Sequence, residues 1–220
     1  MNIKKAEETL ERERNGKLRL PDELLWQIGI CHVIIGNFHE AYNLFKKSFF
    51  TMLKPPMIWS MSAQPNQLVQ VFFLSCEFGY KEEVIFHLQE YRKKDKIGDN
   101  FYANVSYAIM GLKYPDLGWT TKSIEKLLSA PEFKDTFSIG NCILALENFD
   151  QTCFSDSIIE LIEAHKGMAT RGSLRGTPEG WLCLPAMVLI YLAELRGMKI
   201  SIENDYISQT YIDYLISLKI

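Results

Sequence analysis

The segment 181–193 constrains the fold of this chain most, because it contains no charged residue. It is shorter than the roughly 20 residues that a helix needs to cross a membrane. Pro185 lies within it, so the helix begins either at Thr177, with a kink at Pro185, or close to Leu184. We expect this helix to be buried on most sides in a globular protein, with no membrane partner.

The rest of the chain has the periodicity of amphipathic helices. Between residues 38 and 52, apolar side chains recur at helical spacing, while His39, Lys46 and Lys47 occupy the opposite face. Similar stripes, separated by glycine, proline or asparagine, predict further helices at 67–78, 81–94, 101–112, 123–130, 136–149, 153–165 and 209–218. The sequence therefore predicts an all-α fold.

Short connections indicate how these helices pair. Gly36-Asn37 and Gly79-Tyr80 leave little room between consecutive helices, which favours antiparallel packing. The first pair is loosely similar to a tetratricopeptide repeat in the spacing of Gly29, Gly36, Phe38, Ala41 and Phe45. No convincing second copy follows at a period of about 34 residues. We expect a compact single domain made of an array of antiparallel helix pairs.

Two boundaries can be placed along the chain. Acidic and basic residues alternate over residues 1–19, which predicts a charged N-terminal segment in the form of a frayed, solvated helix. The all-helical domain then covers residues 20–220, and the break around Pro115 and Gly118 makes 113–121 the best candidate for a seam within it.

Composition limits the cellular compartments and the classes of partner that we expect for this protein. The formal net charge of −3 lacks the basic excess typical of nucleic-acid-binding proteins, so we expect no such partner. The chain has 5 cysteines without a CxxC pair, and its first residues are charged instead of forming an apolar signal segment. We therefore expect a cytoplasmic protein whose cysteines are reduced.

Catalytic motifs are missing from the sequence. None of the 4 histidines lies in an HExxH motif, and there is no GxSxG nucleophile elbow. We therefore expect no catalytic residue, no metal site and no cofactor, and interpret the chain as a protein that is not an enzyme.

The candidate functional residues lie in two loops. A glycine-rich basic stretch follows the helix predicted to end at His165, and it carries Arg171 and Arg175. These three side chains either order the loop or bind an acidic ligand or partner, since arginine pairs with carboxylates in both roles. The second loop, 54–64, offers Met57, Trp59 and Met61, which are either interface anchors or a cover folded back over the core.

The last sixty or so residues resemble bacterial polymorphic-toxin immunity protein family 49. The pattern consists of a helix ending in a histidine, a loop with two Arg-Gly pairs, an apolar helix with an internal Pro-Ala, a closing Arg-Gly and a later Asp-Tyr. It is carried by His165, Arg171-Gly172, Arg175-Gly176, Pro185-Ala186, Arg196-Gly197 and Asp205-Tyr206. The family pattern has a proline soon afterwards, where this chain has Ser208 and Gln209.

The resemblance implies a cytoplasmic, all-helical bacterial inhibitor that binds a cognate protein toxin and neutralises it sterically. Two other functions remain open from the residues alone. One is a helix-pair scaffold or regulatory module that binds peptides from several partners. The other is a small-ligand binder or enzyme that uses the loop 165–175, which would require His165 and both arginines to converge on a pocket. For any of these functions, a homodimer stays open as the oligomeric state.

Overall fold

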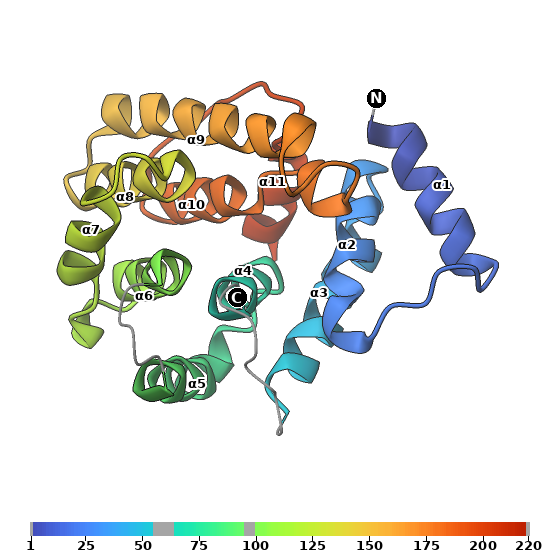
Figure 1. Cartoon of the computed structure of the whole chain (residues 1–220), viewed down its shortest axis with the longest axis horizontal. Helices are drawn as coiled ribbons and strands as arrows, with labels where there is room; N and C mark the ends of the chain where they lie inside the picture. The colour runs from blue at the N-terminus through green and yellow to red at the C-terminus, as the bar shows by residue number, and fades with distance from the viewer. Residues whose placement is uncertain (1, 55–63, 95–99, 219–220) are drawn as a thin grey trace.

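The computed structural model describes residues 2–54, 64–94 and 100–218. These residues contain 11 α-helices and no strand, which confirms the all-α fold predicted from the sequence (Figure 1). The helices form an array around one large core, with a second, smaller apolar cluster beside the N-terminal helix.

The N-terminal part consists of α1 (Asn2–Arg14), the 3-10 helix η1 (Asp22–Leu24), α2 (Leu25–Ile34) and α3 (Phe38–Met52). Helices α2 and α3 form a hairpin through Gly36, whose φ of +80° suits glycine. A Cβ at Gly29 would lie 3.4 Å from the Ala41 carbonyl and from the Phe45 ring. The small residue therefore permits the close approach of these two helices.

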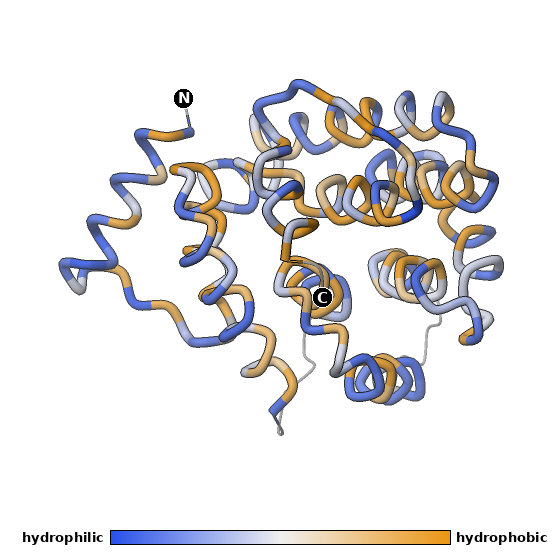
Figure 2. Tube along the Cα trace, turned by 180° about the vertical axis from the view of Figure 1, so that it is seen from behind, coloured by the Kyte–Doolittle hydropathy of each residue, from blue (hydrophilic) through white to orange (hydrophobic). Residues whose placement is uncertain are grey.

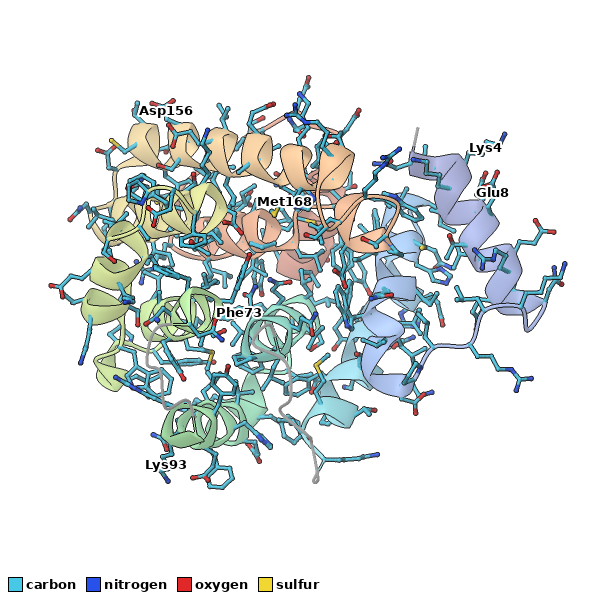
Figure 3. All side chains as sticks on the ribbon, viewed as in Figure 1. Lys4, Glu8, Phe73, Lys93, Asp156 and Met168 are labelled. Atoms are coloured by element: carbon cyan, nitrogen blue, oxygen red, sulfur yellow. The ribbon has the colours of Figure 1, made fainter. Side chains whose placement is uncertain are left out.

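Helix α1 forms as the charged N-terminal segment predicts, but it is not simply solvated. Ala6 and Leu10 are buried against α2 in a small apolar cluster, while Lys4 and Glu8 lie on the outer side (Figure 3). The Asn2 side chain donates a hydrogen bond to the Trp181 carbonyl over 3.3 Å. Two small apolar residues on one face are enough to dock this otherwise hydrophilic helix.

The middle of the chain continues the array with helices on both sides of the suggested seam. The elements are α4 (Gln64–Leu74), η2 (Phe78–Tyr80), α5 (Lys81–Lys94), α6 (Phe101–Lys113), η3 (Pro115–Leu117), α7 (Thr120–Leu128) and α8 (Lys134–Glu147). The main core contains residues from both sides of 113–121, and α6 packs directly on α7 and α8.

The C-terminal part supplies the central helix of the molecule. It consists of α9 (Gln151–Arg171), η4 (Pro178–Gly180), α10 (Leu184–Leu195) and α11 (Gln209–Ser217). Helix α10 begins at Leu184, the later of the two starts that the sequence allowed, so Pro185 lies in the first turn, where its missing N–H is not needed. Residues 186–193 are all buried.

Helix α10 packs against α4, α8, α9 and α11. Figure 2 shows hydrophobic residues along these inner segments and hydrophilic ones along much of α1. Arg196, just after α10, donates to the carbonyls of Leu112 at 2.6 Å and Leu146 at 3.1 Å. It thereby joins the end of α10 to the last turns of α6 and α8. Within the described ranges, no helix is long and apolar enough to span a bilayer.

Candidate functional site

His165 lies inside a helix and not at its end, because α9 continues to Arg171. Its side chain is 4% exposed, and its ring meets the Tyr206 ring edge-on with 5.4 Å between centroids. Burial lowers the pKa of His165 to about 4, against a smaller opposing effect of a hydrogen bond with the Gly180 backbone. The imidazole is therefore neutral near pH 7, and its Nε2 atom is buried without a hydrogen-bond partner in the described structure.

Arg171 and Arg175 lie away from this buried ring. Both side chains are exposed, and neither guanidinium makes a hydrogen bond or ion pair with the part of the chain that the structure describes. Lys166, one turn before the end of α9, pairs with Glu163 at 3.2 Å. Of the three candidate residues from the sequence, His165 is therefore buried, while the side chains of Arg171 and Arg175 point outward and do not hold the loop in place.

Backbone contacts order the loop between α9 and η4, and the arginine side chains take no part in them. The N–H of Arg175 donates to Gly172 over 3.3 Å, and the N–H of Thr177 donates to Leu174 over 3.2 Å. Gly180 packs so closely on the Leu174 carbonyl that a Cβ there would collide with it. The two arginines consequently project from a loop whose backbone is ordered by its own contacts.

A cavity of about 280 Å³ lies beside His165. Its walls come from α2, α4, α6, α8, α9, η4 and the start of α10, and much of the lining is apolar, including Leu161, Met168, Leu174 and Leu182. Figure 3 shows the position of Met168 on the inner side of α9. His165 lines this cavity, whereas Arg171 and Arg175 do not, so the three residues do not converge on one pocket.

The polar part of the cavity wall combines neutral side chains with two carboxyl groups, those of Asp135 and Glu179. Asp135 accepts a hydrogen bond from the Tyr102 hydroxyl at 3.2 Å, and Glu179 accepts one from the Gln27 amide at 2.9 Å. Burial raises the pKa of Glu179, and the hydrogen bond from Gln27 only partly offsets this. Among the described lining residues there is no lysine or arginine.

Sequence reasoning missed most of this cavity. Trp26, Asp135 and Glu179 belong to α2, α8 and η4, and no spacing along the chain connects them. His165, a candidate from the sequence, does line the cavity, but it was singled out for the loop that follows it. The other predicted loop residues, Met57, Trp59 and Met61, lie outside the described residues.

The described residues contain no group of three or more His, Cys, Asp or Glu side chains that could hold a metal ion. Comparisons of the chain with models of protein families, with curated proteins and with solved structures gave no match.

Proposed function

We propose that this protein is an immunity protein that binds a cognate bacterial toxin in the cytoplasm and blocks it by steric occlusion. The supporting observation is that Arg171 and Arg175 are exposed on an ordered loop, with no hydrogen bond or ion pair from either guanidinium to the described residues. The resemblance of residues 165–206 to immunity protein family 49 gives this basic surface its biological interpretation.

Unpaired arginines suit recognition of an acidic protein surface. A guanidinium can make two parallel hydrogen bonds to one carboxylate, which provides direction as well as charge. The cost of ordering the loop is already met by its own backbone hydrogen bonds, so little further ordering is needed on binding. Complementary charge also accelerates association of the two proteins, in a salt-dependent way.

Coexpression with the toxin encoded beside the gene tests this function. The wild-type chain should protect cells and form a complex with that toxin. If it neither rescues growth nor binds the purified toxin, the proposed function is wrong. Capture of peptides from several unrelated proteins, with no binding to the toxin, would favour the scaffold hypothesis instead.

Charge reversal tests the role of the basic loop. The double variant Arg171→Glu with Arg175→Glu should bind the toxin at least about tenfold more weakly, mainly through slower association. A matched variant, Arg12→Glu with Arg19→Glu, changes two exposed arginines in the N-terminal segment and should bind like the wild type. Equal affinity of both double variants would place the interface elsewhere. Circular dichroism checks that both remain folded.

A further inference from the structure

The cavity beside His165 has the general features of a small-molecule site. It combines an apolar lining with a few polar groups, and its volume of about 280 Å³ is near the lower limit of about 300 Å³ for typical ligand pockets. The resulting prediction does not depend on the proposed toxin binding, because the loop arginines do not line this cavity.

Three residues of the cavity wall, Trp26, Asn66 and His165, carry buried polar atoms that lack partners in the described structure. Trp26 is 2% exposed and His165 is 4% exposed, and neither Trp26 Nε1 nor His165 Nε2 has a hydrogen-bond partner in the described structure. Buried polar groups without partners are uncommon in native proteins because each carries a desolvation penalty. A ligand that donates hydrogen bonds to the imidazole and to the Asn66 amide oxygen would remove this penalty for these two atoms.

The protonation state of His165 makes it an acceptor. A hydrogen bond with the Gly180 backbone engages the ring, and burial keeps the imidazole uncharged. With no second proton on the ring, the unpartnered Nε2 offers a lone pair. A neutral imidazole also does not repel a positively charged ligand.

The charge of the wall favours a cation. Asp135 and Glu179 both line the cavity, while no lysine or arginine does so among the described residues. The Glu179 carboxyl accepts a hydrogen bond from the Gln27 amide, which is neutral. A carboxyl group that is half buried without a counter-ion gains from an incoming positive charge.

We propose that this cavity binds a small organic cation, in which an ammonium group contacts the Asp135 carboxylate and the Nε2 atom of His165, while Glu179 adds negative charge to the same wall. The body of the ligand is apolar or aromatic and packs against Leu161, Met168 and Trp26. The ligand class is therefore a primary amine on a short hydrophobic body, and neither a carboxylate nor a phosphate fits this wall.

Three probes of one shape test the charge preference without any substitution. Phenethylammonium, 2-phenylethanol and 3-phenylpropionate share an aromatic body but are positive, neutral and negative at pH 7.5. Calorimetric titration of the full chain should show phenethylammonium binding at least about tenfold more tightly than the alcohol, with no binding of the acid. Equal binding of all three, preference for the acid, or no phenethylammonium binding at millimolar concentration would overturn the proposal.

Substitutions then locate the site. Glu179→Gln and Asp135→Asn each preserve shape while removing a charge, and each should weaken phenethylammonium binding about tenfold. Glu160→Gln, an exposed position on α9 outside the cavity, is the matched control and should leave affinity unchanged. A ligand-induced change in tryptophan fluorescence should disappear in Trp26→Phe. Unchanged affinity in both carboxyl variants would contradict the assignment, even if the wild type binds.

Discussion

Burial of His165 should make the folded protein sensitive to mild acid. The pKa of this histidine falls from 6.5 to about 4 in the folded chain, so between these values the unfolded chain binds a proton that the folded one does not. The contribution of the neutral His165 to stability is therefore fully present above about pH 6.5 and is lost as the pH falls toward 4. The direction follows from burial, which disfavours the charged imidazolium.

The size of the effect follows from the same two values. At pH 5 the histidine is almost fully protonated in the unfolded chain and mostly neutral in the folded one, which lowers the free energy of unfolding by about 2 kcal/mol. For a chain of 220 residues this corresponds to a loss of roughly 4–8 °C in Tm.

Thermal and urea unfolding at pH 7.5 and pH 5.0 measure this loss. His165→Asn is the informative variant, because its amide can still donate toward Gly180 but cannot become charged. The wild type should lose about 2 kcal/mol more than this variant between the two pH values, while His39→Asn, at an exposed position, should keep the wild-type pH dependence. If His165→Asn and the wild type lose equal stability, the buried imidazole is not the cause of acid sensitivity.

Two further substitutions test the packing. Leu10→Ala should lower the free energy of unfolding by about 2 kcal/mol and increase proteolysis of the N-terminal segment, since Leu10 anchors α1. Ile3→Ala, at a 58% exposed position, is the control and should change the unfolding free energy little. Equal effects of the two substitutions would contradict the docking of α1. Gly111→Ala places a Cβ 2.6 Å from Thr120 Oγ1 and 2.8 Å from its backbone nitrogen, so urea unfolding should show a loss of about 1–3 kcal/mol. Gly79→Ala is the control, because a Cβ at this position has no atom within 4 Å. If the Gly111→Ala variant is no less stable than the Gly79→Ala variant, α6 and the start of α7 are not in close contact.

Local sequence patterns predicted the helices well where the deciding signals were close together. The segment 81–94 was predicted as a helix and is α5 (Lys81–Lys94), because its apolar residues alternate with a charged face every turn. The end of α9 was predicted six residues too early. The glycine at 167 suggested a loop, yet Gly167 is not among the glycines with positive φ and lies within α9. A single glycine weakens a helix by about 1 kcal/mol without ending it.

The sequence by itself determined that this protein is all-helical and that its apolar segment 184–193 is the interior, since amphipathic periodicity and the absence of charge are properties of neighbouring residues. Only the tertiary structure decided that α1 is docked, that His165 is neutral and that Trp26, Asp135 and Glu179 share one cavity with it. Burial, desolvation and missing hydrogen-bond partners arise where faces of distant helices meet, and no spacing along the chain specifies which faces those are.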